Sequence, residues 1–282
     1  MQLIRQAGQM AHTARALRRQ GTSVGFVPTM GALHDGHGSL IRAARKEARR
    51  VVVSIFVNPL QFGPQEDYER YPRDLKRDLK LAKAWGADVI FAPHASQMYP
   101  AGFSTTIDLS SLTSRLEGTV RPGHFQGVLT VVTKLFLLVQ PTVVYFGQKD
   151  YQQAVLIQRL IKELDFDIAF RLMPTVREAD GLAMSSRNVY LDPAQRQAAP
   201  VLFKALTLGK DQLKAGQRQV AALVEAMRHY IEEDGQAQIE YLDIVHAKTL
   251  EPLTEVTGRV ALLGSIQVGA TRLIDNLLVD VP

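Results

Sequence analysis

Cysteine is absent from the 282 residues, and this absence limits the chemistry open to the protein. Disulfide bonds, thiolate metal sites and cysteine nucleophiles are all excluded. A chain without cysteine also fits a reducing compartment, so we expect a cytoplasmic protein. The reacting groups must come from histidine, lysine, serine and the backbone.

The chain also lacks a strong excess of charge and a long apolar run. Lysine and arginine number 33, aspartate and glutamate 28, and the formal net charge of +5 suits small anionic ligands without indicating nucleic acid. Residues 1–20 mix apolar and polar side chains at helical spacing, unlike the apolar core of a signal peptide. The most apolar stretch, 128–146, is interrupted by Lys134, Gln140 and Pro141. We therefore expect neither secretion nor a membrane span.

Residues 1–175 repeat one pattern, in which a short apolar run ends in a glycine or proline loop and a helix with an apolar stripe follows. The pattern predicts βαβ units, and strands this apolar predict a parallel sheet buried on both faces. The stretch 92–123 shows no long period and predicts an irregular excursion. The expected strands are 24–27, 51–56, 88–91, 142–146 and 168–172, and the expected helices are 37–48, 73–85, 126–139 and 150–164.

A second domain is expected over residues 176–282, because the pattern changes after Pro174. Two helical patterns precede three alternating strands, and a tight turn at Gly269 and Ala270 joins the last two strands. These elements predict a smaller α+β domain, so the fold class is α/β with an α+β C-terminal part. The helical patterns cover 193–215 and 217–233, and the strands cover 239–245, 260–268 and 271–279.

The strongest local signal is PTMGALHDGHGSL, residues 28–40, which follows the first expected strand and precedes a helix. Open α/β sheets bind ligands at such a position. His34 and His37 flank Gly36, and the positive end of the helix attracts phosphate. A turn with two packing histidines is the plain alternative. The H-x-G-H spacing resembles the signature of nucleotidylyltransferases and class I aminoacyl-tRNA synthetases, whose histidines contact ATP phosphates.

Two further motifs carry phosphate-binding groups. FGQKDYQQ, residues 146–153, places Lys149 between a strand and a helix, where a solvated lysine beside the helix cap Asp150 is an equally good interpretation. MSSRN, residues 184–188, has two hydroxyls and a guanidinium in a row. For so short a pattern alone, a Ser/Asn turn with an exposed arginine is the better interpretation. The position of MSSRN between the two domains resembles the lysine-serine loop of the same superfamily.

Three weaker signals concern the substrate and its surroundings. Asn58 and Gln61, in VNPLQF, offer amides beside an apolar wall and would orient a small polar substrate, although a proline turn with solvated amides is common. Arg121 and His124 flank a proline-glycine turn that leads into a buried helix, and we interpret them as site architecture. Asp88, at a strand start, could meet a metal but is more simply a cap or surface group.

Six segments in this order resemble the pantothenate synthetase family: PTMGALHDGH, NPLQF, EDYERYPR, RPGHFQGV, FGQKDYQQ and MSSRN, spread over residues 28–188. The resemblance implies a Rossmann-like nucleotide-binding domain, a smaller C-terminal lid, magnesium dependence and a homodimer. It also implies a reaction of ATP, pantoate and β-alanine through a pantoyl adenylate, with release of AMP and pyrophosphate. Two alternatives stay open from the residues alone: a nucleotidylyltransferase that needs no amine, and an RNA-binding module.

The resemblance also implies roles for individual residues, while the magnesium ligands stay unknown. The catalytic set consists of His34, His37, Lys149, Ser185, Ser186 and Arg187. The pantoate-binding set consists of Asn58, Gln61 and Gln153, with Gln61 also near the amine. The ATP-binding set consists of Met30, Gly31, His34, His37, Gly147, Lys149, Asp150, Val176, Met184, Ser185, Ser186 and Arg187.

The chain departs from the family pattern at two positions. The family usually has an acidic residue where this chain has Gln148, and a larger apolar residue where it has Gly38. Neither change removes a reacting group. Glycine in a first helical turn is expected to cost up to about 1 kcal/mol against alanine, and to loosen the loop that holds the histidines.

Overall fold

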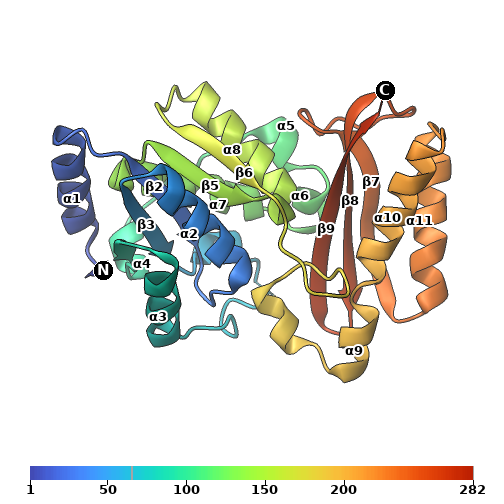
Figure 1. Cartoon of the computed structure of the whole chain (residues 1–282), viewed down its shortest axis with the longest axis horizontal. Coiled ribbons are helices and arrows are strands. Elements are labelled where there is room, and N and C mark those ends of the chain that lie inside the picture. The colour runs from blue at the N-terminus through green and yellow to red at the C-terminus, as the bar shows by residue number, and fades with distance from the viewer. Residues whose placement is uncertain (65, 282) are drawn as a thin grey trace. The chain divides into compact units, whose positions relative to one another are not determined.

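The computed structural model describes residues 1–64 and 66–281 and divides the chain into two compact units (Figure 1). Unit 1 consists of Met1–Gly147 and Leu156–Pro174, and unit 2 of Gln148–Val155 and Thr175–Pro282. Compared with the expected division after residue 175, residues 148–155 and Thr175 group with unit 2.

Unit 1 is built on a six-stranded parallel sheet with the strand order β1-β4-β3-β2-β5-β6. The five expected strands are confirmed to within two residues at each end. The edge strand β1 was not predicted, because three residues at the start of a helical pattern show no period of their own. The strands are β1 Gln2–Ile4, β2 Val24–Thr29, β3 Arg50–Ile55, β4 Val89–Phe91, β5 Val143–Gly147 and β6 Ala169–Met173.

Helices cover both faces of this sheet, as expected. Val27, Val53 and Ile90 pack with α2 Asp35–Glu47 and α3 Leu75–Trp85 in one buried cluster. On the other face Phe26 meets Phe136 of α7 edge to face, at 6.5 Å between ring centroids. Burying each such side chain contributes about 1.5–3 kcal/mol, so the sheet and its helices form one core. The other elements are α1 Ala7–Arg19, η1 Pro59–Gln61, α4 Ala95–Met98, α5 Ser110–Thr113, α6 Glu117–Val120, α7 His124–Val139 and α8 Tyr151–Glu163.

The strand order reverses between β2 and β5. From β2 the chain adds β3 and then β4 on one side, whereas β5 and β6 lie on the other. Ligands of open α/β sheets bind outside the carboxyl ends of strands at such a reversal. The loop after β2 is therefore the first place to look for a site in unit 1.

Unit 2 contains an antiparallel sheet in the order β7-β8-β9, with α10 and α11 along it (Figure 1). The predicted two-residue turn is confirmed, because Val268 pairs with Thr271 across it. The helical pattern expected over 193–215 is wrong in one respect: it is two helices, because Pro200 has no N–H to donate and interrupts the ladder. The elements are η2 Gln148–Asp150, η3 Ser186–Tyr190, α9 Pro193–Ala198, α10 Val201–Lys214, α11 Val220–Asp234, β7 Ala237–His246, β8 Gly258–Val268 and β9 Thr271–Val281.

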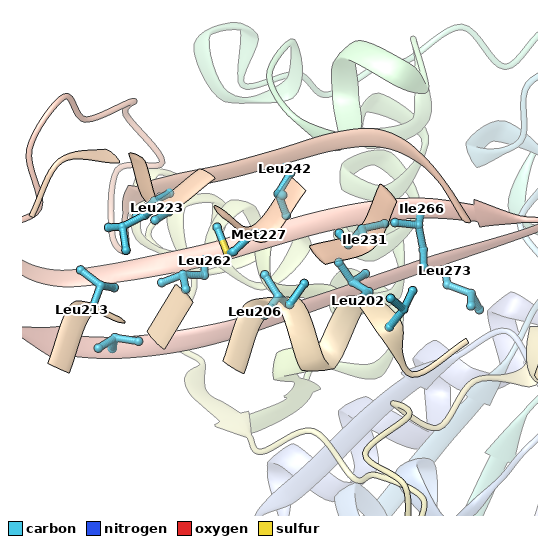
Figure 2. Packing of buried hydrophobic residues seen from close by; sticks show 14 of the residues in the cluster. Leu202, Leu206, Leu213, Leu223, Met227, Ile231, Leu242, Leu262, Ile266 and Leu273 are labelled. Atoms are coloured by element: carbon cyan, nitrogen blue, oxygen red, sulfur yellow. The ribbon is translucent and has the colours of Figure 1, made fainter. Parts of the chain in front are cut away.

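The core of unit 2 lies between the two helices and the sheet. Leu206 of α10, Met227 of α11 and Leu262 of β8 are fully buried and belong to one cluster (Figure 2). This separate core is what makes unit 2 a compact body of its own. Within residues 1–64 and 66–281, none of the helices is long and apolar enough to cross a membrane.

Gly38 has a packing role that the sequence did not reveal. A Cβ added at Gly38 would lie 2.7 Å from Cε2 of Trp85, which packs across from it on α3. That distance is too short for two carbons, so alanine at this position would require the indole of Trp85 to shift. The indole occupies the space that a side chain at position 38 would need, and this packing opposes the stability cost expected for glycine in the first helical turn.

Candidate functional site

The loop at the carboxyl end of β2, residues 30–34, is held by one buried carboxylate. Both oxygens of Asp78 accept backbone N–H bonds, from Ala32 at 2.9 Å and from Leu33 at 2.8 Å. Burial raises the pKa of Asp78, and the two N–H bonds act in the opposite direction. Gly31 has φ +86° and Ala32 has φ +49°, so both residues adopt a left-handed backbone conformation. The two hydrogen bonds to Asp78 stabilise this conformation.

His34 of this loop and His37 of the first turn of α2 cap the helix together. Nδ1 of His34 accepts from Gly36 N at 3.2 Å, and Nδ1 of His37 accepts from His34 N at 3.3 Å. The ring centroids lie 4.2 Å apart. A neutral imidazole whose Nδ1 accepts carries its proton on Nε2. Each ring therefore has an Nε2–H donor at the N-terminus of a 13-residue helix, a position that favours phosphate oxygens.

Asn58 and Gln61 lie beside the same loop, buried to 1% and 9% exposure. Asn58 Nδ2 donates to Gln61 Oε1 and to Gly127 O, both at 3.1 Å. Gln61 Nε2 lies 2.9 Å from Met30 Sδ. The structure thus brings Gln61, one of the predicted pantoate-binding amides, against Met30, a member of the predicted ATP-binding set.

Arg121 and His124 support Gln61 from the backbone side. His124 Nδ1 lies 2.8 Å from Gln61 O, and Arg121 Nη2 donates to the same carbonyl at 3.2 Å. Because Arg121 also donates toward His124 Nε2, at 3.1 Å, the ring proton is on Nδ1. Burial, assisted by the Arg121 charge, lowers the pKa of His124 to about 4. Burial acts to raise the pKa of Glu66, but the bonds from Arg121 outweigh it and leave that pKa lowered.

The predicted groups of unit 2 begin with Lys149, which lies in the 3-10 turn η2 before α8. Asn276 of β9 holds this turn, because its Nδ2 donates to Gln148 O at 2.8 Å and to Lys149 O at 2.9 Å. Gln148 Nε2 donates to Asn276 Oδ1 at 3.2 Å. Lys149 Nζ lies 3.8 Å from Asp150 Oδ1, and Gln153 lies partly buried in the following turn.

The MSSRN segment forms the second predicted site element of unit 2. Ser185 caps η3, and its Oγ accepts from Arg187 N at 3.2 Å. Met184 N donates to Val176 O at 3.0 Å, which closes the preceding turn. Ser185, Ser186 and Arg187 are partly buried. Both η2 and η3 contact β9, so the turn of Lys149 and the MSSRN turn lie against the same strand.

Asp88 is a structural residue. It accepts from Arg45 Nη1 at 2.7 Å and from Val51 N at 2.8 Å, so its carboxylate joins α2 to β3. No group of three or more His, Cys, Asp or Glu side chains that could hold a metal ion occurs among residues 1–64 and 66–281.

Two residues that organise the site were missed in the sequence. Asp78 is 45 residues from Leu33, and Asn276 is 127 residues from Lys149, so neither lies within a motif. Asp78 did leave a signal, as a carboxylate on the apolar face of α3 that also carries the buried Ala82. Asp275 and Asn276 left another, as two consecutive polar residues that interrupt an apolar stretch of the last strand, between Ile274 and Leu277.

The chain matches a family model described as pantoate-beta-alanine ligase over residues 2–278. It is 52% identical over 281 residues to the pantothenate synthetase of Moorella thermoacetica, a match that covers 100% of this chain and 99% of that protein.

Solved structures agree with this match. The pantothenate synthetase of Thermus thermophilus superposes with a TM-score of 0.93 at 48% identity, covering 98% of this chain and 99% of the other. A pantoate-beta-alanine ligase from Francisella tularensis, complexed with beta-gamma ATP and beta-alanine, superposes with a TM-score of 0.82 at 34% identity. That match covers 99% of this chain and 97% of the Francisella chain.

Proposed function

Since this chain belongs to the pantoate-beta-alanine ligase family, we propose that it joins pantoate to β-alanine in an ATP-dependent reaction that yields pantothenate, AMP and pyrophosphate. The observation that carries the proposal in unit 1 is the juxtaposition at the end of β2. Two imidazoles there present Nε2–H donors at a helix N-terminus, and a buried amide, Gln61, lies against the same loop.

Activation by ATP answers the chemical difficulty of the reaction. A carboxylate does not condense with an amine in neutral water, because its acyl carbon is a poor electrophile and hydroxide is a poor leaving group. Attack of the pantoate carboxylate on the α-phosphorus forms an acyl adenylate and releases pyrophosphate. The free amine of β-alanine then attacks the acyl carbon, and AMP leaves. Positioning and charge stabilisation supply the catalysis, without a covalent enzyme intermediate.

We assign phosphate binding to the described groups of each unit. In unit 1, His34 and His37 donate to phosphate oxygens as neutral rings, and the α2 dipole adds to their effect. In unit 2, Lys149 supplies a positive charge, and Ser185, Ser186 and Arg187 supply donors for the pyrophosphate. Met30, Gly31, Gly147, Asp150, Val176 and Met184 complete the proposed ATP-binding set, and Gln153 the proposed pantoate-binding set.

Magnesium would be bound mainly by the phosphates of ATP, with one carboxylate of the protein beside them. Mg²⁺ commonly binds through one or two carboxylates together with substrate phosphates. Asp150 is the carboxylate within the Lys149 motif, with its side chain 49% exposed. When bound, the ion neutralises phosphate charge, and we propose Asp150 as its protein contact.

The test of the proposed function is a product assay with ATP, pantoate and β-alanine. Pantothenate, AMP and pyrophosphate should form in a one-to-one-to-one ratio, and ADP in place of AMP would contradict the adenylate. Labelled pyrophosphate should also exchange into ATP when pantoate is present and β-alanine absent. Exchange that requires all three substrates would show that no free-standing adenylation step occurs.

A homodimer in the cytoplasm completes the proposal. The dimer follows from the family resemblance, and the absence of cysteine supports the location. Light scattering at micromolar concentration should give twice the 31.3 kDa of one chain. The mass of a single chain would refute the dimer and leave the ligase proposal intact.

A further inference from the structure

We propose that Asn58 and Tyr99 are positioning residues, which turn the amide of Gln61 so that it presents N–H donors to the acid substrate. This inference rests on the proposed function and deepens it. It assigns Gln61 to an acceptor oxygen of pantoate, and it removes Asn58 from direct contact with any substrate.

The first observation is that every hydrogen-bonding position of Asn58 is already used inside unit 1. An asparagine amide has two N–H donors and a carbonyl oxygen with two lone pairs. Nδ2 donates to Gln61 Oε1 and Gly127 O. Oδ1 accepts from Leu60 N at 3.3 Å and from the Tyr99 hydroxyl at 2.7 Å. With a relative exposure of 1%, Asn58 has no polar group left for a ligand.

The second observation is that backbone groups fix the orientation of the Asn58 amide. Amide oxygen and nitrogen are assigned from their hydrogen-bond partners. Gly127 O can only accept and Leu60 N–H can only donate, so turning the Asn58 amide over would oppose like groups at both ends. The close approach depends on Gly127, where an added Cβ would overlap the Leu60 carbonyl.

The orientation is transmitted from Asn58 to Gln61. Because Asn58 Nδ2 donates to Gln61 Oε1, the Gln61 nitrogen must point away from Asn58, and it lies 2.9 Å from Met30 Sδ. A thioether is a weak acceptor, so an oxygen of a ligand is the stronger partner for these N–H groups. Gln61 therefore selects a carboxylate or hydroxyl oxygen and disfavours an ammonium group.

Tyr99 keeps the Asn58 carbonyl occupied on its remaining side. Its ring packs between Phe56 and Phe103, at centroid distances of 6.1 Å and 5.0 Å, which directs the hydroxyl. Burial raises the pKa of Tyr99, so the hydroxyl stays protonated and donates throughout the neutral range. The hydroxyl reaches the predicted site through its bond to Asn58, so an effect of this group on catalysis passes through that amide.

The first experiment compares Tyr99→Phe with Tyr145→Phe in the full-length protein. Each variant removes one phenol hydroxyl that donates at 2.7 Å within unit 1, since Tyr145 donates to Glu47 Oε2. We expect both to lower the melting temperature, but only Tyr99→Phe to raise the KM for pantoate, by roughly five- to tenfold, the equivalent of one hydrogen bond. KM for ATP should stay within about twofold of wild type, a difference smaller than one hydrogen bond. Equal pantoate KM values in the two variants, or an equal rise in KM for ATP, would overturn the proposal.

The second experiment tests the donor directly with Gln61→Glu and Gln61→Ala. Glutamate can still accept from Asn58, but it presents an acceptor where the amide presents donors. We expect Gln61→Glu to raise the KM for pantoate more than Gln61→Ala does. If Gln61→Glu instead binds pantoate better than Gln61→Ala, the amide presents its oxygen, and the inferred orientation is wrong.

Failure of the inference and failure of the proposed function give different results. If the wild-type protein makes no pantothenate, the proposed function fails, whatever the variants do. If the wild-type protein is active and the variants behave otherwise than stated, only the positioning role of Asn58 and Tyr99 is wrong.

Discussion

The loop of His34 in unit 1 and the turn of Lys149 in unit 2 are each held by a single side chain that is distant in the sequence. One of these side chains accepts hydrogen bonds from the backbone, and the other donates them. Asp78 is a carboxylate that accepts from two backbone N–H groups, whereas Asn276 is an amide that donates to two backbone carbonyls. Asp78 is a titratable carboxyl group, and burial raises its pKa, whereas Asn276 does not titrate. We call a side chain that holds such a segment through two backbone hydrogen bonds a brace. The brace of unit 1, Asp78, is titratable, and the brace of unit 2, Asn276, is neutral.

The difference shows that the backbone groups which face inward determine whether an acceptor or a donor side chain can hold a segment. A loop that turns its N–H groups inward, as at the start of α2, needs an acceptor, and a carboxylate supplies two with one side chain. A turn that leads into α8 from a strand leaves carbonyls inward and needs donors, which only an amide supplies in pairs without charge. Each brace can be broken separately.

The largest effect should come from removing a predicted phosphate-binding side chain in either unit. We expect His37→Ala in unit 1 and Lys149→Ala in unit 2 each to lower kcat by about 10² to 10³, as for a lost oxyanion donor. The melting temperature should fall by at most a few degrees, because His37→Ala removes only one capping bond of α2. Steady-state kinetics and thermal melting provide the measurements. A Lys149→Ala protein within about tenfold of wild type, below the range just given, would show that the lysine is a solvated residue at a helix start.

Acid should act on unit 1 through His124. Its folded pKa of about 4 lies below the unfolded value, so its contribution to stability is complete above the unfolded pKa of 6.5 and is lost as pH falls toward 4. The loss amounts to roughly 3 kcal/mol. Between pH 7 and pH 4, His124→Asn should therefore lose less unfolding free energy than wild type. Denaturant titrations at each pH measure this, and His229→Asn, on the exposed face of α11, is the control that should match wild type.

Breaking the carboxylate brace comes next in size. Asp78→Asn places an NH₂ group against a buried N–H, which leaves a donor unsatisfied at a cost of about 1–3 kcal/mol. Displacement of the His34 loop should lower kcat/KM by about 10- to 100-fold. Asp74→Asn removes the same charge four residues earlier, where asparagine still caps α3 through the Arg77 N–H bond. Equal activity in the two variants would show that Asp78 only stabilises the fold.

Breaking the amide brace should have a smaller effect. Asn276→Asp replaces the donor to two carbonyls by an acceptor, but Gln148 and Lys149 are only partly buried and Asp150 is exposed, so the turn can relax. We expect kcat to fall by about tenfold, or about 1.4 kcal/mol. Gln238→Glu, the same chemical change at an exposed position of β7, is the control. An Asn276→Asp variant as active as this control would show that the turn needs no brace.

The smallest effect is expected for Gln148→Glu, the change toward the usual residue of the family. Glutamate loses the 3.2 Å bond to Asn276 Oδ1 and sets two acceptors against each other, at a cost of about 0.5–1.5 kcal/mol. The melting temperature should fall by a few degrees while kcat stays within about threefold, less than one hydrogen bond is worth. A melting temperature that rises would show that the carboxylate finds another donor.

The repeating elements of the fold were predictable because they depend on local pattern. The strands of unit 1 were located to within two residues, since short apolar runs between glycine and proline loops have few other interpretations. The strand β1 and the break at Pro200 were missed, because the first is too short to show a period and the second interrupts an otherwise continuous one.

The site was predictable only where its groups share a motif. His34 and His37 lie in one segment with the helix that they cap, so their proximity could be inferred. The functions of Asp78, Tyr99 and Asn276 depend on partners 41 to 128 residues away in the chain. The saturation of Asn58 was hidden for the same reason, because its decisive partner is the carbonyl of Gly127.

The contact of Trp85 with Gly38 has a spectroscopic consequence. Trp85 is the single tryptophan of the chain, and it packs against α2 at Gly38 and at the guanidinium of Arg42, which lies 5.8 Å from the ring centroid. Selective excitation of the indole therefore observes one junction in unit 1, while the tyrosines of both units stay silent. Emission from the unmodified protein should follow the opening of the α2–α3 junction, and circular dichroism the loss of all helices. A difference between their midpoints would reveal whether the two units unfold together.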